Sequence, residues 1–184
     1  MAAIVSPRVL VVFHTGEGQT EKIAERIVCE LERRDALVAL SDAASAPPPT
    51  AYDLVVVGDS IHTGRHSRQL TRWVEQHERE LASVPVAMFQ VGLTSANDDE
   101  DHTAEATRMV QAFLDDTALD PVMVGLFAGA LAYTRYGWFT RLLMKRIAAR
   151  EGHDTETGVD HEYTDWQAVD AFARDVLSVA DRSE

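Results

Sequence analysis

The chain has 184 residues, of which 46% are hydrophobic and 26% are charged. This length and composition fit one globular domain and exclude a disordered chain or a fibrous repeat. The formal net charge of −13 disfavours general attraction to phosphates, so we expect no nucleic-acid partner. Cys29 has no second cysteine to pair with, the N-terminus lacks a signal-peptide pattern, and the longest apolar run, 122–132, is too short to span a bilayer. We therefore expect a cytoplasmic protein.

Apolar residues alternate along the chain between two patterns. Continuous apolar runs, typical of strands covered on both faces, stand at 8–13, 36–40, 53–58, 85–91 and 122–131. Helical spacing of apolar residues stands between and after them, over 23–34, 70–81, 106–113 and 166–176. Thr164 and Gln167 suit a capping box at the start of the last helix. Because parallel neighbouring strands need crossover helices, this alternation predicts an α/β fold with a doubly wound five-stranded parallel sheet, in a single domain over 1–184.

The loop after the first strand, His14-Thr15-Gly16-Glu17-Gly18-Gln19-Thr20, has the chemistry of a phosphate cradle. In a doubly wound sheet, ligands bind beyond the carboxyl ends of the strands, and this loop leads into a helix N-terminus. Backbone N–H groups, the helix dipole and the hydroxyls of Thr15 and Thr20 can surround an anion. The loop contains no Arg or Lys, and Lys22 is the nearest cation in the sequence. We therefore expect a small phosphate monoester held by neutral donors, with Glu17 turned to solvent.

Three other interpretations apply to this loop. A nucleotide-hydrolase P-loop is excluded, because its Gly-Lys-Ser/Thr ending is absent. A dinucleotide site is an alternative, since Gly16 and Gly18 fit the first two glycines and Asp42 follows the second strand, where an acid would bind ribose; Glu21 stands where the third glycine belongs. A plain strand-to-helix turn is the other alternative.

Several segments of the chain together resemble one protein family. They are Gly18-Gln19-Thr20, Ser60-Ile61 with Gly64, Ala128-Gly129-Ala130-Leu131, Tyr133 with Arg135-Tyr136 and Trp138, and Tyr163-Thr164-Asp165-Trp166. Thr15 to Thr20 is similar to the FMN-phosphate loop of flavodoxins, and the other segments extend the likeness over nearly the whole chain to the flavodoxin-type, menaquinone-dependent protoporphyrinogen IX dehydrogenases. The resemblance implies a flavodoxin-like sheet of order 2-1-3-4-5 with FMN as cofactor. It also implies an oxidoreductase of heme biosynthesis that oxidises protoporphyrinogen IX to protoporphyrin IX, with menaquinone or another quinone as electron acceptor.

The resemblance also implies which residues contact the cofactor. The expected contacts to the FMN phosphate are His14, Thr15, Gly16, Glu17, Gly18, Gln19 and Thr20. The flavin ring is expected to lie on the two loops at 60–65 and 92–97. The expected ring contacts are Ser60, Ile61, His62, Gly64, Gly92, Leu93, Thr94 and Ser95. Neither ring loop contains an aromatic residue that could stack on the flavin, so His62 is the nearest substitute. Gly64 would permit a close backbone approach to the flavin N5 position. The flavin carries the chemistry, so we expect no metal and assign no catalytic side chain.

Residues 132–161, between the last strand and the last helix, form a basic insertion that short flavodoxins lack. Residues 132–150 hold five basic residues and no Asp or Glu. We expect a contact with substrate or membrane from Arg135, Trp138, Arg141, Lys145 and Arg146. An apolar and cationic surface suits the propionates of a porphyrinogen, or anionic lipids in a peripheral contact with the inner face of the cell membrane. A solvated surface helix or a homodimer contact is the alternative.

The same residues bear on other functions as well. A flavodoxin-like FMN electron-transfer protein, without porphyrinogen activity, is the main alternative. A serine hydrolase is disfavoured, because Gly58-Asp59-Ser60, Asp99 and His102 stand on the third strand and in mid-chain, where nothing sets up a relay. His62 and His66 lack an obvious third ligand, so we expect solvated histidines there, and we place Cys29 on a buried helix face.

Overall fold

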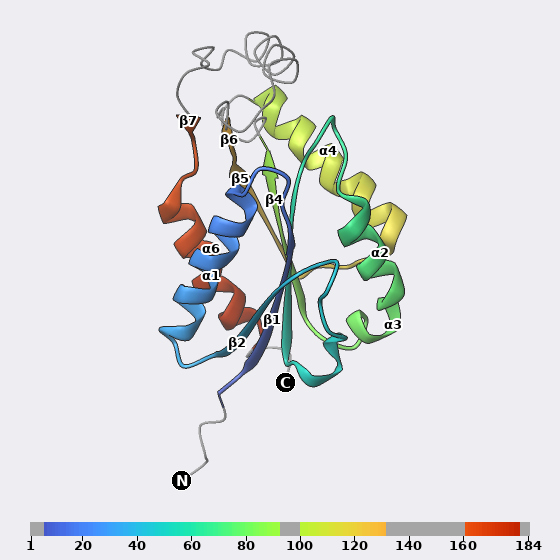
Figure 1. The fold of residues 1–184 in the computed structure, drawn as a ribbon, viewed down its shortest axis with the longest axis vertical. Helices are drawn as coiled ribbons and strands as arrows, with labels where there is room; N and C mark the ends of the chain where they lie inside the picture. The colour runs from blue at the N-terminus through green and yellow to red at the C-terminus, as the bar shows by residue number, and fades with distance from the viewer. Residues whose placement is uncertain (1–5, 93–99, 132–160, 181–184) are drawn as a thin grey trace.

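A five-stranded parallel sheet forms the centre of the structure, a computed structural model that describes residues 6–92, 100–131 and 161–180 (Figure 1). Its strands are β1 (Arg8–His14), β2 (Leu37–Asp42), β3 (Leu54–Ser60), β4 (Val86–Gly92) and β5 (Met123–Ala128). The order is β2-β1-β3-β4-β5, with every neighbouring pair parallel. The predicted flavodoxin-like doubly wound sheet is thereby confirmed.

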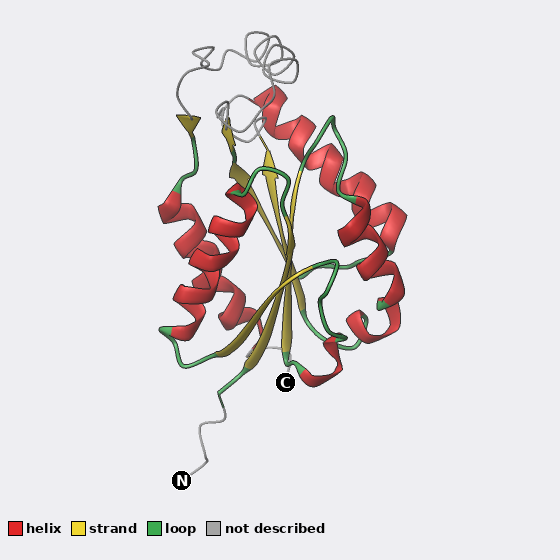
Figure 2. Cartoon of the chain, in the orientation of Figure 1, coloured by secondary structure: helices red, strands yellow, loops and turns green. Residues whose placement is uncertain are grey.

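Helices cover both faces of this sheet (Figures 1 and 2). One face is covered by α1 (Gln19–Glu32) and α6 (Trp166–Ala180), and the other by α2 (Arg68–Gln76), α3 (Glu78–Leu81) and α4 (Glu100–Thr117). A 3₁₀ turn, η1 (Pro49–Ala51), precedes β3, and two short strands, β6 (Ala130–Leu131) and β7 (His161–Glu162), pair antiparallel beside the sheet. The helices therefore supply the crossover connections that parallel neighbouring strands require.

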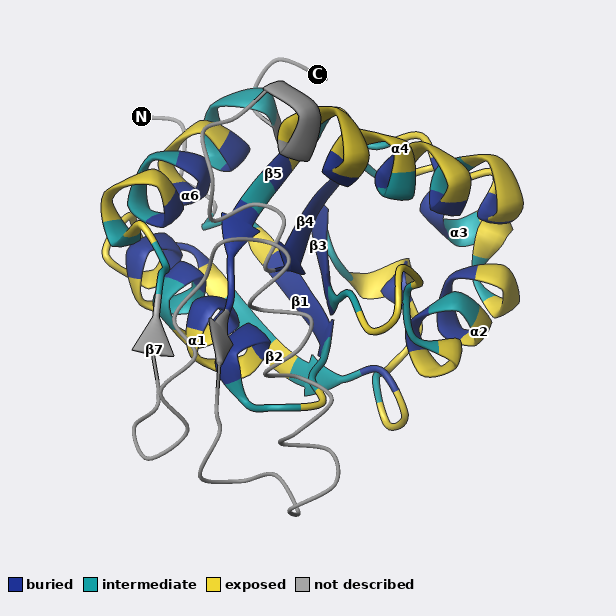
Figure 3. Ribbon diagram, turned by 90° about the horizontal axis from the view of Figure 1, so that it is seen from above, coloured by how far each residue is buried: buried dark blue, intermediate teal, exposed yellow. Residues whose placement is uncertain are grey.

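Each face of the sheet has its own core, and β1 contributes to both. Val9 and Val11 pack toward α1 and α6, whereas Leu10 and Val12 pack toward α2 and α4, and all four are fully buried. Seen from above, the central strands are buried along most of their length (Figure 3). Burial on both faces explains why these strands are continuous apolar runs rather than alternating ones.

Two predicted elements are divided in the structure. The helix expected over 70–81 is two helices, because His77 leaves helical geometry (φ −116°, ψ 22°) between α2 and α3. The apolar positions keep helical spacing across that break, so periodicity could not reveal it. The strand expected over 122–131 ends at Ala128. The next residue, Gly129, donates its N–H to the carbonyl of Gly92, and its own carbonyl accepts from the N–H of Tyr163.

Two side-chain predictions on the helices were wrong. Asp165, and not Thr164, caps α6, since its Oδ1 accepts hydrogen bonds from the backbone N–H groups of Gln167 and Ala168 at 2.9 and 3.1 Å. The hydroxyl of Thr164 is instead committed to tertiary contacts. Cys29 is exposed rather than buried. The buried face of α1 is formed by Ile23, Ala24, Ile27 and Leu31, and Cys29 does not lie on that face.

Candidate cofactor site

The carboxyl ends of β1, β3 and β4 bring most of the predicted cofactor residues to one edge of the sheet. The strands end at His14, Ser60 and Gly92, and the register places His14 beside Asp59 and Ser60 beside Val91. The loop 14–20, the loop 60–65 and Gly92 therefore share this edge. Leu93, Thr94 and Ser95 lie outside the described residues.

The loop between β1 and α1 is closed by its own hydrogen bond and leaves the helix start uncapped. Thr15 Oγ1 accepts from the backbone N–H of Gly18 at 2.8 Å, and Gly18 is the N-cap of α1 with φ 91°. No side chain in the described part of the chain caps this helix start. Because the first turn of a helix has N–H groups without intrahelical partners, these donors can hold an anion.

Thr20 gives the most direct sign of a ligand at this helix start. Its side chain is fully buried, and its Oγ1 has no hydrogen-bond partner among the described residues. A buried hydroxyl without a partner is costly unless a bound group completes it. Together with the uncapped helix start, this donor fits the phosphate of a cofactor.

The loop between β3 and α2 forms a tight turn next to the phosphate loop. His62 N–H donates to Arg65 O at 3.1 Å and Arg65 N–H donates to His62 O at 3.2 Å, with positive φ at both central residues, Thr63 (50°) and Gly64 (74°). This is the pattern of a type I′ turn, which glycine adopts without strain. The His62 imidazole lies against Gly16, where a Cβ would have no room, so the two loops are in contact. His62 is exposed, Ile61 is half-buried, and Ser60 Oγ is buried with no partner among the described residues.

Asp59 and His66, which the sequence did not single out as site residues, lie beneath this second loop. Asp59 is fully buried, and its two oxygens accept backbone hydrogen bonds from Ser60 at 3.0 Å and Ser67 at 2.6 Å. His66 Nδ1 is 3.3 Å from Asp59 Oδ2, and the His66 ring packs on Phe113 with centroids 4.5 Å apart. The expected solvation of His66 was wrong, because its side chain is only 5% exposed. The signal available in the sequence was an acid placed directly after the apolar run of β3.

A further polar chain joins the phosphate loop to the end of β5. Gln19 Nε2 donates to Thr164 Oγ1 at 2.8 Å, and Thr164 Oγ1 donates to the carbonyl of Ala128 at 2.8 Å. Gln19 is buried, and its side chain links the start of α1 to Thr164 instead of extending into solvent. At the other end of the loop, His14 Nδ1 lies 3.6 Å from Asp42 Oδ2. Asp42, the acid that a dinucleotide site would use to bind ribose, therefore already has His14 beside it.

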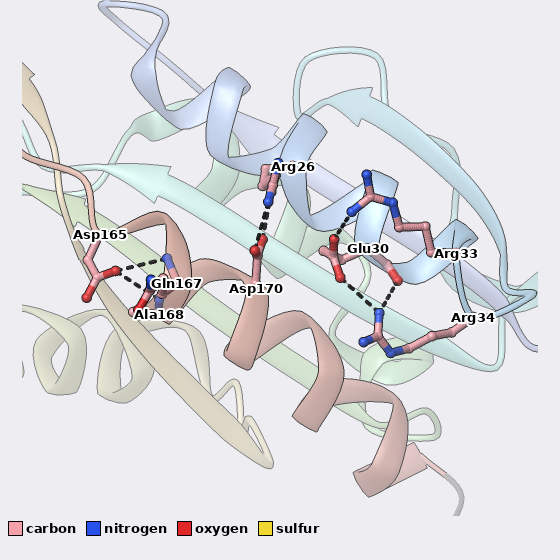
Figure 4. A network of polar contacts seen from close by, with 8 residues as sticks. All are labelled: Arg26, Glu30, Arg33, Arg34, Asp165, Gln167, Ala168 and Asp170. Atoms are coloured by element: carbon pink, nitrogen blue, oxygen red, sulfur yellow. Dashed lines mark hydrogen bonds and ion pairs between the residues drawn. The ribbon is translucent and has the colours of Figure 1, made fainter.

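Charged side chains hold α1, which carries the phosphate loop, against α6 (Figure 4). The Arg26 guanidinium donates two hydrogen bonds to the Asp170 carboxylate, at 2.6 and 2.8 Å, and this holds the pKa of Asp170 below its usual value. Glu30 accepts from Arg33, the C-cap of α1, and from Arg34 in the turn that follows, and these bonds, that from Arg34 above all, lower its pKa. The anchoring of α1 is therefore independent of the loop itself.

The predicted substrate or membrane residues lie outside the described residues. They are Arg135, Trp138, Arg141, Lys145 and Arg146. Within the ranges that the structure does describe, no group of three His, Cys, Asp or Glu side chains is arranged to hold a metal ion. None of the helices in those same ranges has the length and apolar character needed to cross a membrane.

Comparison with known proteins places this chain in a family. A family model described as a flavodoxin domain matches residues 10–158. The chain is similar to two proteins named protoporphyrinogen IX dehydrogenase (quinone): one from Leishmania major, 36% identical over 95% of this chain and 76% of the relative, and one from Escherichia coli K12, 33% identical over 95% and 97%.

Solved structures agree on the fold. A short-chain flavodoxin associated with a bacterial microcompartment superposes with a TM-score of 0.58 at 13% identity, covering 95% of this chain and 99% of that one. An archaeal flavodoxin gives 0.56 at 14% identity, with the same two coverages. Membership of the flavodoxin family indicates a flavin cofactor, which agrees with the uncapped start of α1 and with the buried Thr20 hydroxyl that has no partner among the described residues. The chain belongs to the flavodoxin domain family and, within it, to the flavodoxin-type protoporphyrinogen IX dehydrogenases.

Proposed function

We propose that the protein is an FMN-dependent enzyme of heme biosynthesis that oxidises protoporphyrinogen IX to protoporphyrin IX with a quinone as electron acceptor. Six electrons and six protons leave the porphyrinogen in three two-electron steps, and each step reduces one quinone to its quinol. The observation that carries this proposal is the likeness to the two named dehydrogenases over 95% of the chain. A match of that extent includes most of residues 132–161.

FMN, rather than another flavin form, is supported by the loop between β1 and α1. Its donors are the backbone N–H groups at the start of α1 and the buried Thr20 hydroxyl, which suit a phosphate monoester. We expect the ring to rest on the loop at 60–65 and on Gly92, Leu93, Thr94 and Ser95. When bound, FMN supplies the two-electron chemistry, and this chain binds it, orients it and limits the access of water.

The basic segment is proposed to recognise substrate or membrane. Arg135, Arg141, Lys145 and Arg146 carry positive charge in a chain whose net charge is −13, so an acidic partner would meet them selectively. The propionates of the porphyrinogen provide such acidic groups, as do anionic lipids near a menaquinone pool. Trp138 adds an apolar surface suited to either one.

The experiment compares the enzyme with its alternatives in one preparation. FMN added to purified protein should give an oxidised flavin spectrum with quenched fluorescence, and the loaded protein should form protoporphyrin from protoporphyrinogen with a soluble quinone under anaerobic conditions. FMN binding without turnover, together with rapid single-electron exchange with a redox protein, would favour the electron-transfer alternative. NAD binding without FMN binding would favour a dinucleotide site.

A further inference from the structure

We propose that Asp59 is a positioning residue for the flavin: its carboxylate fixes the loop 60–67, which then presents its backbone to the flavin ring. The inference rests on the proposed function, since it takes FMN as the ligand of this edge of the sheet. Asp59 itself is fully buried and lies beneath the loop. Its effect on the flavin is therefore indirect, through the backbone that it holds.

The carboxylate of Asp59 binds the loop at both ends. Oδ1 accepts from the N–H of Ser60, where the chain leaves β3, and Oδ2 accepts at 2.6 Å from the N–H of Ser67, eight positions after Asp59. Ser67 is also the N-cap of α2, with its Oγ accepting from the N–H of Leu70. One side chain thus ties the exit of β3 to the entry of α2.

The placement of an acid here is costly for the core, which argues for a specific task. Val55 and Val57 precede Asp59 on the same face of β3 and belong to the apolar core, whereas Asp59 buries a carboxylate at the next position of that face. A buried carboxylate is tolerated only where hydrogen bonds offset its desolvation. All the partners that the structure gives Asp59, namely Ser60, His66 and Ser67, belong to the loop itself.

The loop needs such a constraint because its own turn is strained. Thr63, a β-branched residue, has φ 50°, a conformation that costs free energy and persists only where the surrounding structure enforces it. The turn 62–65 is held by two backbone bonds of its own, and it also carries His62 against the phosphate loop. With both ends fixed by Asp59, the turn is presented to a ligand in one arrangement.

Asp59→Asn tests this with minimal change of shape. An amide has one acceptor oxygen, so its NH₂ group must face one of the two backbone N–H donors, and one end of the loop is released. FMN and riboflavin affinities are measured by fluorescence quenching, with circular dichroism in the visible range to report ring placement and urea unfolding to report stability. Asp53→Asn is the matched control, because Asp53 accepts a 2.7 Å backbone bond from Arg8 where β1 begins, at the opposite end of that strand from the loop.

We expect Asp59→Asn to weaken both flavins about tenfold or more and by the same factor, since riboflavin keeps the ring and lacks the phosphate. The visible dichroism of bound FMN should change, and Asp53→Asn should alter neither affinity. Lower stability with unchanged flavin affinities and dichroism would overturn the inference, because Asp59 would then serve folding alone. Loss confined to FMN would overturn it too, because the phosphate loop and not the ring loop would be affected.

A second pair of variants decides the matter if Asp59→Asn does not fold. Ser67→Pro removes the N–H that Asp59 accepts, at a residue whose φ of −70° already suits proline, whereas Ser67→Ala removes only the cap to Leu70. Weaker riboflavin binding in Ser67→Pro than in Ser67→Ala supports the inference, and equal binding overturns it. If the unmodified protein binds neither flavin, the proposed function fails and the inference falls with it.

Discussion

Gln19 and Thr164 are hydrogen-bonded at 2.8 Å although 145 positions separate them in the chain. The same Thr164 hydroxyl donates to Ala128 O, so one side chain joins the start of α1, the end of β5 and the approach to α6. These three elements meet beside the loop between β1 and α1. The Thr164 hydroxyl therefore connects the cofactor edge at the start of α1 to the end of β5.

Thr164→Val should lower the free energy of unfolding by about 1 to 3 kcal/mol, because it leaves the buried Gln19 amide and the Ala128 carbonyl without their partner. FMN affinity should fall as well, since Gln19 lies in the first turn of α1. Urea unfolding and flavin titration measure the two effects. Thr107→Val is the control: its hydroxyl bonds Thr103 O on an exposed helix face, and we expect a change within about 0.5 kcal/mol. Equal effects of the two variants would contradict a special role for Thr164.

Asp170→Asn should destabilise the protein at neutral pH and lose its effect in acid. The hydrogen bonds from Arg26 hold the pKa of Asp170 below its usual value, so its charged form favours the folded state. That contribution is fully present above the unfolded pKa, near about 3.9, and disappears as the pH falls through the lower folded pKa. The difference in unfolding free energy between the unmodified protein and Asp170→Asn should stay constant from about pH 7 to pH 5 and shrink below about pH 4.

The matched control for this pH profile is Asp175→Asn, an exposed acid on the same helix. Because it leaves the Arg26–Asp170 pair intact at an exposed position, its effect on the free energy of unfolding at neutral pH should stay within about 0.5 kcal/mol. A constant difference down to about pH 3 for Asp170→Asn would show that the Arg26 pair does not stabilise the fold through the charge of Asp170.

Thr20→Val should weaken FMN about tenfold while leaving the stability of the unliganded protein within about 0.5 kcal/mol, because Thr20 Oγ1 has no partner to lose among the described residues. Riboflavin affinity should not change, since it has no phosphate. Thr15→Val is the informative contrast: Thr15 Oγ1 accepts from Gly18, so this variant should lower both stability and FMN affinity. Equal losses for riboflavin and FMN in Thr20→Val would contradict a phosphate contact.

Combined Arg141→Glu and Lys145→Glu should leave FMN content and thermal stability nearly unchanged, because both residues are far along the chain from the phosphate loop. Porphyrinogen turnover, or sedimentation with anionic vesicles at low salt, should fall sharply. Loss in detergent solution with a soluble quinone indicates the propionates, and loss only with vesicles indicates lipid. No change in either assay would refute a substrate or membrane role for these two residues.

The sheet was predictable from the sequence because strands buried on both faces are continuous apolar runs. The run at 8–13 and the similar run in β3 required no knowledge of their neighbours, and the loop at 14–20 follows from the end of the first run. The strand order 2-1-3-4-5 came from the family resemblance rather than from periodicity. The ends of helices were harder to predict. Thr164 and Asp165 are both good N-cap residues, and Asp165 takes the role because Thr164 is hydrogen-bonded to Gln19 and Ala128.

The polar support of the site could not be predicted, because it depends on contacts between side chains and distant backbone. In the sequence, Asp59 stood out only as part of the Gly58-Asp59-Ser60 segment considered for a serine hydrolase. Its contact with the backbone of Ser67 depends on the path of the loop between them. His66 was expected to be solvated because the sequence offered no third metal ligand near it, yet the fold places it on Phe113. Exposure of Cys29 likewise depends on the direction of the α1 stripe toward α6 and the sheet, which the helical pattern alone left undetermined.

The central claim is most directly tested by anaerobic turnover. Protein loaded with FMN is mixed with protoporphyrinogen IX and a soluble menaquinone analogue, and protoporphyrin fluorescence and quinol are measured together. The account predicts protoporphyrin formation that requires both FMN and quinone, with three quinols formed per porphyrin, and a lower rate in Thr20→Val at limiting FMN. Bound FMN that is reduced and reoxidised by other donors, with no porphyrin formed above the protein-free rate, would contradict it.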